Sequence, residues 1–193
     1  MRQIAEFVAV LACGLFTGAA IYVSLVEHPA RMECGVETAM AEFPPSYRRG
    51  TVMQATLAVV CLLSSIAAWL AGATFWWAIA GLLLGSVIPF TLIVILPTNK
   101  QLLSPTLDNR SEQAGLLLTR WGRLHAVRSI LSGLALLLLL YLLLHPADAV
   151  AIHGSAVVRS FGAAFLVPHI DGDTGPAQLR FCGLSPRVFL LPS

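Results

Sequence analysis

Three residues that can bind and deprotonate a small molecule share one helical stripe near the start of the last apolar run. Trp121, His125 and Arg128 stand at i, i+4 and i+7, so a helix presents them on the same face. Trp121 offers an apolar plate and one N–H donor. His125 exchanges a proton near neutral pH, and Arg128 carries a fixed positive charge suited to an oxyanion. The stripe predicts a site for a flat, acidic, oxygen-bearing molecule, with His125 and Arg128 as the catalytic residues.

Further polar residues end the first and third apolar runs and are predicted to contribute to substrate binding. Glu27, His28 and Arg31 follow the first run, and Asn99 follows the third. Because Glu27 and His28 are adjacent, their side chains point about 100° apart on a continuing helix. Either His28 lines the mouth of a pocket while Glu27 pairs with Arg31 or Arg128, or Glu27 is the base. An interfacial salt bridge explains the same residues, and Asn99 also fits ordinary turn chemistry.

The composition identifies the environment of these residues. Of 193 residues, 57% are hydrophobic and only 11% are charged, whereas soluble domains carry about 25% charged residues. So few charges cannot cover a soluble surface, and the chain is predicted to be an integral membrane protein in contact with the lipid bilayer. A net charge of +2 leaves no basic stripe for phosphates, which excludes nucleic acid as a partner. Four cysteines without CxxC spacing indicate neither a zinc site nor a disulfide framework.

Four apolar runs are each long enough to cross a bilayer, which needs about 20 residues per helix. They cover residues 4–26, 52–73, 75–96 and 126–144. The predicted fold is therefore all-α, a four-helix transmembrane bundle formed by residues 1–146. The last helix is expected to begin earlier, near Glu112. Residues 147–193 lack helical periodicity, so an irregular, poorly ordered C-terminal extension is predicted there.

Alternating helix direction brings the polar segments to one end of this bundle. A polar cluster above an apolar bundle is typical of the mouth of a pocket. The competing interpretation is an interfacial Trp121 anchor, with Arg128 reaching the headgroups and His125 hydrogen-bonded beside them. That interpretation suffices for Trp121 alone. For His125 and Arg128 we favour function, because ionisable groups at membrane depth are functional candidates by default.

The distribution of basic residues predicts the orientation of the chain. Arg2 stands alone at one side, while eight basic residues lie in or beside the loops after the first and third runs: Arg31, Arg48, Arg49, Lys100, Arg110, Arg120, Arg123 and Arg128. By the positive-inside rule these loops face the cytoplasm. We therefore predict a multi-pass protein of the plasma (inner) membrane of a bacterium. The sequence gives no indication of the oligomeric state.

The motifs around these residues resemble one known family. The segments that carry the resemblance are Gly14-x-x-x-Gly18, Ser24-x-x-Glu27-His28-Pro29-Ala30-Arg31, Met53-Gln54, Leu96-Pro97-Thr98-Asn99-x-x-Leu102, and Trp121-x-x-x-His125 followed by Arg128. Together they resemble the anthrone oxygenase-like family of small four-span membrane proteins, over about residues 4–145. Much of that family is known only as a domain of unknown function. The tail beyond Pro146 departs from the family pattern.

The resemblance implies an activity. Some fungal relatives oxidise anthrones to anthraquinones with dioxygen, without a tightly bound metal or flavin. A base removes the acidic C–H, the enolate reacts with dioxygen, and the peroxide collapses to a quinone. By resemblance, the chain is expected to be a cofactor-independent oxygenase for a hydrophobic aromatic or quinone-like molecule, with dioxygen as co-substrate. His125, Arg128 and Trp121 fit the base, the cation and the aromatic plate, and Asn99 can assist.

Two other classes of function stay open. One is a haem- or metal-binding redox protein that uses His28 and His125, which the topology places on the same side of the membrane. The other is a non-catalytic membrane component whose charged loops bind a partner. Metal content of the purified protein and turnover by His125→Ala distinguish these classes from the oxygenase.

Overall fold

The computed structural model describes residues 1–145, and the predicted tail at 147–193 lies outside them. Its elements are α1 (Arg2–Tyr22), η1 (Val23–Glu27), α2 (His28–Glu33), α3 (Val36–Leu70), α4 (Trp76–Gly85), α5 (Val87–Phe90), η2 (Thr91–Ile95), α6 (Leu96–Leu102) and α7 (Glu112–Leu144). Consecutive elements join into four stretches that are long and apolar enough to cross a membrane: Arg2–Glu33, Val36–Leu70, Trp76–Leu102 and Glu112–Leu144. The predicted all-α fold with four membrane-length helices is confirmed.

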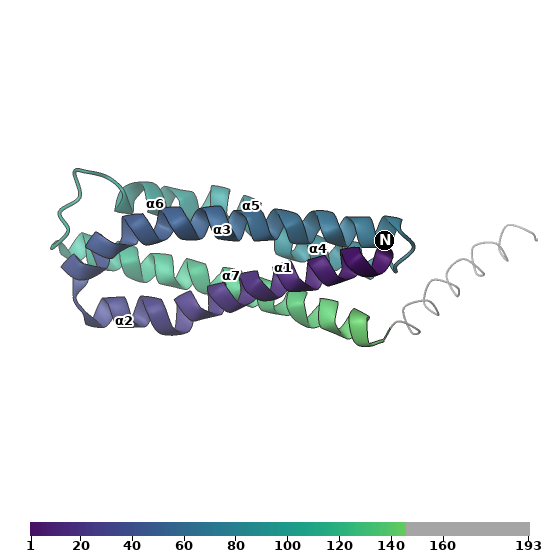
Figure 1. Ribbon diagram of the computed structural model, residues 1–193. Helices are drawn as coiled ribbons and strands as arrows, with labels where there is room; N and C mark the ends of the chain where they lie inside the picture. The colour runs from purple at the N-terminus through teal and green to yellow at the C-terminus, as the bar shows by residue number, and fades with distance from the viewer. Residues whose placement is uncertain (146–193) are drawn as a thin grey trace, which may run out of the picture.

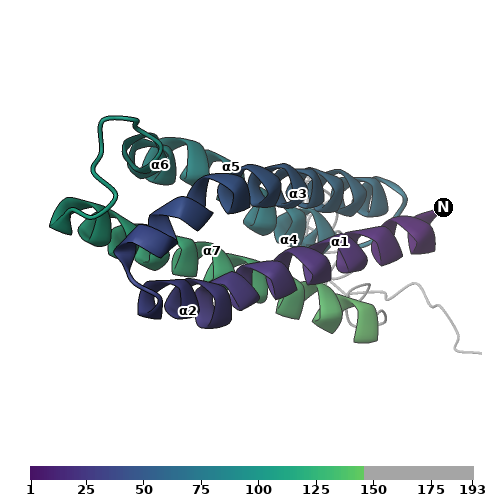
Figure 2. The same ribbon diagram turned by 60° about the vertical axis from the view of Figure 1, so that its left-hand side comes forward.

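The four stretches surround one another in a fixed order (Figures 1 and 2). α1 packs against both α3 and α7, and α4 packs against the same two helices. α3 and α7 therefore face each other across the diagonal of the bundle. The α2–α3 and α6–α7 connections lie at one end, whereas the N-terminus and the α3–α4 turn lie at the other.

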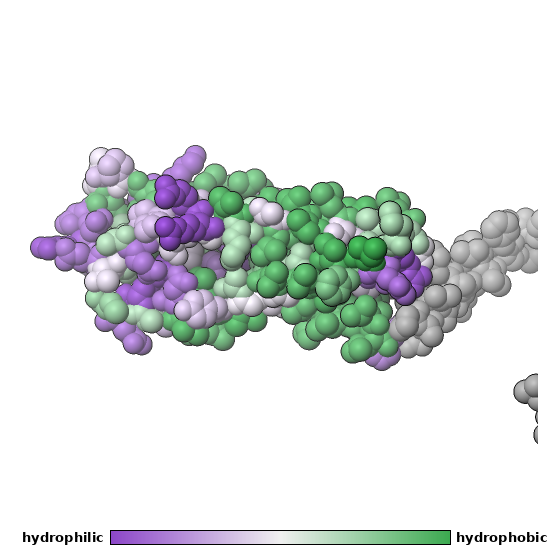
Figure 3. Space-filling view, viewed as in Figure 1, coloured by the Kyte–Doolittle hydropathy of each residue, from purple (hydrophilic) through white to green (hydrophobic). Residues whose placement is uncertain are grey.

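The surface divides in the same way. Hydrophilic residues gather at the end that carries α2, α6 and the start of α7, and a smaller group lies near the N-terminus (Figure 3). Between them is a hydrophobic belt, on which large apolar side chains such as Leu63, Ile93 and Leu137 are exposed. An exposed apolar belt of this kind is what contact with bilayer hydrocarbon requires. We call the hydrophilic end with α2 and α6 the polar end.

Two of the four stretches contain a π-helical turn just before a proline. η1 precedes Pro29, and η2 precedes Pro97. Proline lacks the N–H that would pair with the carbonyl four residues earlier, so the regular α-helical pattern is interrupted there. π-helical turns occur frequently at functional sites. Here η1 covers residues 23–27 and lies at the polar end of the bundle.

α3 begins at Val36, well before the apolar run that starts at residue 52. The helix continues through Pro44 and Pro45, a pair that in the sequence favours a loop. The N-terminal part of this helix carries Phe43 and Tyr47, whose rings stack with centroids 5.7 Å apart. The extension of α3 is what brings these two aromatic residues over the bundle.

Two Gly-x-x-x-Gly pairs lie in the apolar helices, Gly14/Gly18 in α1 and Gly81/Gly85 in α4, and only the second allows close helix contact. A Cβ added at Gly81 of α4 would lie 2.6 Å from the Cβ of Ser65 on α3, so glycine is required there. At Gly14 the nearest atom would be 3.9 Å away, and nothing lies within 4 Å of Gly18. The close approach is therefore between α3 and α4.

Candidate functional site

A cavity of about 40 Å³ lies between η1, α2, α3 and α7 at the polar end. Four of the predicted site residues line it, namely Arg31, Trp121, His125 and Arg128. The other lining residues are Val23, Phe43, Ser46, Tyr47, Gly50, Thr51 and Gln54. The cavity combines two guanidinium groups, one imidazole and several aromatic and amide groups in a space of a few water molecules.

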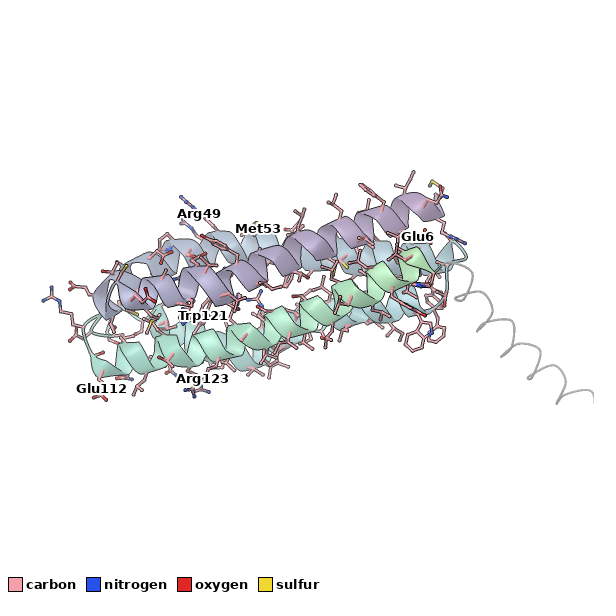
Figure 4. The ribbon with its side chains drawn as sticks, turned by 90° about the horizontal axis from the view of Figure 1, so that it is seen from below. Glu6, Arg49, Met53, Glu112, Trp121 and Arg123 are labelled. Atoms are coloured by element: carbon pink, nitrogen blue, oxygen red, sulfur yellow. The ribbon has the colours of Figure 1, made fainter. Side chains whose placement is uncertain are left out.

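α7 positions the predicted stripe. The helix begins where the Ser111 hydroxyl accepts from the Ala114 N–H at 3.2 Å, a regular N-cap. Trp121 and His125 are buried, with ring centroids 4.9 Å apart. Figure 4 shows Trp121 lying between the helices, whereas Arg123 on the same helix points away from the bundle. The stripe thus faces the interior at the level of the cavity.

Arg128 is a half-buried cation without an acidic partner in the described part of the chain. Its Nη2 donates to Gln54 Oε1 at 2.6 Å, and its guanidinium carbon lies 5.7 Å from the centre of the Phe16 ring. Its Nε is buried and makes no hydrogen bond. Within residues 1–145, no carboxylate forms a salt bridge with Arg128. Burying a charge without a counterion is costly, which makes this position a candidate for binding an anion.

Arg31 is also buried, but it is neutralised. It forms a salt bridge with Glu27, and its Nε lies 3.0 Å from Glu42 Oε2. Ser46 joins this network by donating to Glu27 Oε1 at 2.9 Å. Of the two arrangements that the sequence leaves open for Glu27, the structure shows the pair with Arg31. The carboxylate of Glu27 borders a neighbouring groove and not the cavity itself.

His28 lies beside the site without lining the cavity. Its imidazole packs against α7 at Gly122, where an added Cβ would overlap the ring. The centroids of His28 and Trp121 are 5.3 Å apart, so His28 supports the indole from the side of α2. The hypothesis of a shared haem or metal ligand gains no support from this placement, because His125 borders the cavity and His28 does not.

Asn99 is fully buried in α6 and does not line the cavity. Its Oδ1 has no hydrogen-bond partner. Thr98 beside it is buried as well, with a similarly unpaired hydroxyl. The structure therefore places Asn99 within the α6 region, apart from His125 and Arg128.

His125 is held from one side only. Its Nδ1 lies 3.1 Å from the hydroxyl of Ser24, which belongs to η1. Its Nε2 makes no hydrogen bond to any residue in the described part of the chain, and the ring borders the cavity. The imidazole can therefore exchange a proton with a molecule in the cavity through Nε2.

A larger groove of about 510 Å³ adjoins the cavity between α1 and α3. The two spaces share Val23, Ser46, Gly50 and Gln54. Arg49 and Met53 lie along the groove and on the outer side of α3 in Figure 4. A groove of this size is in the range of small-molecule sites, and it connects the cavity to the outer surface of the bundle, where Tyr22 and Met53 are exposed.

A third space of about 100 Å³ touches the cavity from the apolar side. It shares Thr51, Gln54 and Arg128 with the cavity, and its remaining lining is mostly apolar: Phe16, Ala55, Ala58, Val87, Ile88, Thr91 and Leu92. Gln54 borders all three spaces. Within residues 1–145, no group of three or more His, Cys, Asp or Glu side chains could hold a metal ion.

Several site residues were not among those predicted from the sequence. Gln54 had a visible signal, since it is the one amide side chain in the apolar run at residues 52–73, yet it was not assigned to the site. Tyr47 begins a polar segment that leads into the second apolar run, but neither it nor Phe43 was assigned to the site, because both precede the run that starts at residue 52. Ser24 and Gly122 carry no signal of their own, because their roles depend on how α1, α2 and α7 pack.

Comparison with known proteins gives two matches. A family model described as anthrone oxygenase matches residues 43–138. A protein of Aspergillus fumigatus named anthrone oxygenase tpcL is 31% identical over 138 residues, which cover 66% of this chain and 85% of that protein. No solved structure matches the chain.

Proposed function

This chain belongs to the anthrone oxygenase family, and we propose that it is a membrane oxygenase for a hydrophobic aromatic molecule with an acidic C–H. Dioxygen is the proposed co-substrate. The observation that carries this proposal is the half-buried cation of Arg128, which has no carboxylate partner within residues 1–145 and lines the same cavity as His125. A base next to an uncompensated cation suits a reaction that removes a proton and creates an oxyanion.

Arg128 supports the anion that the proton transfer creates. In an anthrone the methylene carbon lies across the central ring from the carbonyl group and is conjugated with it through the flanking rings, so loss of its proton moves negative charge to the carbonyl oxygen. An arginine at that oxygen lowers the energy of the anion more than that of the neutral substrate, so it favours the transition state. Arg31, already paired with Glu27 and Glu42, has less charge to offer. Arg128 is therefore the proposed oxyanion partner, and Gln54 orients its guanidinium.

His125 is the proposed base, acting through Nε2. For an anthrone it removes one proton from the methylene carbon, leaving the enolate. That carbon then forms a C–O bond with dioxygen, which is reduced to a peroxide and takes up the proton from His125. Loss of the second proton from the carbon breaks the O–O bond, forms the second carbonyl and releases water. One anthrone and one dioxygen give one anthraquinone and one water.

The sizes of the spaces suggest how such a substrate is held. The cavity of about 40 Å³ is too small for three fused rings, whereas the adjoining groove of about 510 Å³ is large enough. We place the ring system mostly in the groove, with its long axis directed past Gly50 and Gln54, so that the carbonyl edge of the central ring turns toward Arg128 and the opposite methylene edge toward His125. Trp121 and Phe43, whose rings meet edge to face at 5.3 Å, form the aromatic wall of the cavity.

The proposal includes the cellular setting and the lack of a cofactor. The steps above use residues of this chain and dioxygen only, so no metal or flavin is needed.

Two of the basic residues counted for orientation, Arg31 and Arg128, belong to the site. The other six are exposed at the polar end: Arg48, Arg49, Lys100, Arg110, Arg120 and Arg123. The proposed orientation is therefore retained, with the polar end in the cytoplasm of a bacterium and the helices in its inner membrane.

Turnover of anthrone by the purified, detergent-solubilised protein tests the proposal. We expect quinone formation above the uncatalysed rate, reduced at least 100-fold in His125→Gln. His145→Gln is the matched control, because His145 is exposed at the far end of α7. A folded wild-type protein with no turnover, or His125→Gln with full turnover, would contradict the proposal.

A further inference from the structure

A chain of hydroxyl groups leads from His125 to a backbone carbonyl of α1. His125 Nδ1 lies 3.1 Å from Ser24 Oγ, and Ser24 Oγ lies 2.8 Å from Ser129 Oγ. Ser129 Oγ donates to the Ala20 carbonyl oxygen at 2.9 Å. We call the hydroxyls of Ser24 and Ser129, together with the Ala20 carbonyl, the serine relay.

The carbonyl at the end of this relay determines the direction of every hydrogen bond in it. A carbonyl oxygen can only accept, and a hydroxyl group has a single proton to give. Ser129 gives its proton to Ala20, so it can only accept from Ser24. Ser24 has then used its own proton, so it can only accept from His125. Nδ1 must therefore carry a proton.

If the hydrogen bonds of the relay ran in the opposite direction, the relay would contain fewer of them. If Ser24 donated to Nδ1, Ser129 would have to donate to Ser24, and the relay would contain two hydrogen bonds instead of three. The oxygen atoms of Ser129 and Ala20 would then face each other at 2.9 Å with no proton between them. An N–H at Nε2 would also share the cavity with the guanidinium groups of Arg31 and Arg128, which are donors only.

We propose that the serine relay fixes neutral His125 as the Nδ1–H tautomer, which leaves Nε2 as a bare acceptor toward the cavity. Ser24 and Ser129 are thus positioning residues. The relay stays the same when Nε2 takes up a proton, because Nδ1 donates to Ser24 in both charge states. His125 can therefore accept and return a proton without any rearrangement of the hydroxyl groups. The tautomer follows from the relay alone, whereas its value for catalysis rests on the proposed function.

The π-helical turn η1 and α7 bring the parts of the relay together. Ser24 lies in η1, Ala20 in the last turn of α1, and Ser129 one helical turn after His125 on α7. The relay thus joins α1 to α7 at the level of the cavity. Loss of the partner that orients a metal-bound histidine typically costs 10- to 100-fold in activity, and we expect a loss at the lower end of this range for the relay.

Nuclear magnetic resonance of the full-length protein carrying isotope-labelled histidine tests the tautomer directly. The chain has five histidines, and His125→Gln identifies the signal of His125 by its disappearance. We expect the neutral ring to be protonated at Nδ1 in the wild type. In Ser129→Ala, Ser24 loses its acceptor and turns to donate to Nδ1, so the signal should shift toward the Nε2–H tautomer.

Two further variants separate the relay from general effects on folding. Ser24→Thr keeps the hydroxyl and should keep the wild-type tautomer. Ser132→Ala is the matched control, because Ser132 is buried on α7 and donates to the Ser129 carbonyl at 3.0 Å, outside the relay. It should also leave the tautomer unchanged. An Nε2–H tautomer in the wild type, or an Nδ1–H tautomer that survives in both Ser129→Ala and Ser24→Ala, would overturn the proposal.

Activity provides an independent second measurement. With anthrone as substrate, we expect Ser24→Ala to lower kcat about tenfold with little change in KM, since the relay positions the base and does not bind the substrate. The Nδ1–H tautomer without any turnover in the wild type would support the relay and count against the proposed function. Turnover with an Nε2–H tautomer in the wild type would support the proposed function and count against the relay.

Discussion

Arg128 and Gln54 are hydrogen-bonded across the diagonal of the bundle, with Nη2 of Arg128 2.6 Å from Oε1 of Gln54. The bond links α7 to α3, two helices that otherwise make little contact. It also fixes the guanidinium between the cavity and the apolar space of about 100 Å³, both of which Arg128 lines. A neutral amide holds this cation in place without cancelling its charge, and the charge remains available for an anionic ligand.

Replacing Arg128 by glutamine should weaken binding of a planar aromatic anion without harming the fold. The glutamine can still donate to Gln54, but the positive charge is lost. We expect a loss of about 10- to 100-fold in affinity for anthracene-9-carboxylate, measured by its fluorescence, since a hydrogen bond to a charged group contributes about 1.5–3 kcal/mol. Thermal stability should stay equal or increase, because a half-buried charge without a counterion is removed.

Arg123→Gln is the control for this experiment. Arg123 is exposed on the same helix and points away from the bundle (Figure 4), so its removal changes the net charge equally without touching the site. Equal affinity losses in both variants would show that Arg128 acts only through long-range charge, and the assignment of the oxyanion partner would be wrong.

Filling the groove at Gly50 should impair substrate access. Gly50 borders both the groove and the cavity, and nothing lies within 4 Å of a Cβ added there. The Cβ of Gly50→Leu therefore meets no clash, and the side chain beyond it would occupy space that the ring system would use. We expect KM for anthrone to rise about tenfold, as for loss of a few apolar contacts in a pocket, while the thermal unfolding midpoint stays within a few degrees.

Gly18→Leu tests whether added bulk alone has this effect. Gly18 also has free space around it, but it is exposed on α1 and borders none of the three spaces described above. Its variant should keep the wild-type KM. If Gly50→Leu also keeps the wild-type KM, the substrate does not enter between α1 and α3.

Replacing Gly122 by alanine should destabilise the contact between α2 and α7. The added Cβ overlaps the imidazole of His28, and overpacking of this kind costs about 1–3 kcal/mol. We expect a lower thermal unfolding midpoint in detergent and recovery of part of it in the double variant with His28→Ala. Gly133→Ala on the same helix meets nothing within 4 Å and should be neutral or slightly stabilising.

The sequence predicts the helices that carry this site better than the contacts between them. Apolar length predicts the four membrane helices, and the 3.6-residue period predicts that Trp121 and His125 share a buried face. The start of α7 at Glu112 also follows from the helical pattern. These features depend on one segment at a time, so periodicity and length are sufficient to predict them.

The remaining features depend on contacts between segments. A pair of prolines in a segment with charges indicates a loop, yet α3 runs through Pro44 and Pro45 and carries Tyr47 to the cavity. The bond between Ser24 and Ser129 requires the π-helical turn and the packing of α1 on α7 together. Such pairs have no spacing rule, because their residues are about a hundred positions apart.

Metal analysis of the purified protein tests the cofactor-free reaction. We expect less than stoichiometric iron, copper or zinc per chain, and turnover that survives dialysis against a chelator, because the proposed steps need no metal. Cys34→Ser, which removes an exposed thiol, should be included as a control for adventitious metal binding. Stoichiometric iron or copper that disappears in His125→Ala would instead identify His125 as a metal ligand.

The central claim is that His125 takes a proton from carbon while Arg128 holds the resulting oxyanion, and hydrogen–deuterium exchange tests it most directly. Anthrone is incubated with the protein in deuterated buffer without dioxygen, so that only the proton transfer can occur. We predict exchange at the methylene carbon well above the buffer rate, lowered at least 100-fold in His125→Gln and markedly in Arg128→Gln. Exchange at the buffer rate in the folded wild type, or undiminished exchange in His125→Gln, would contradict the account.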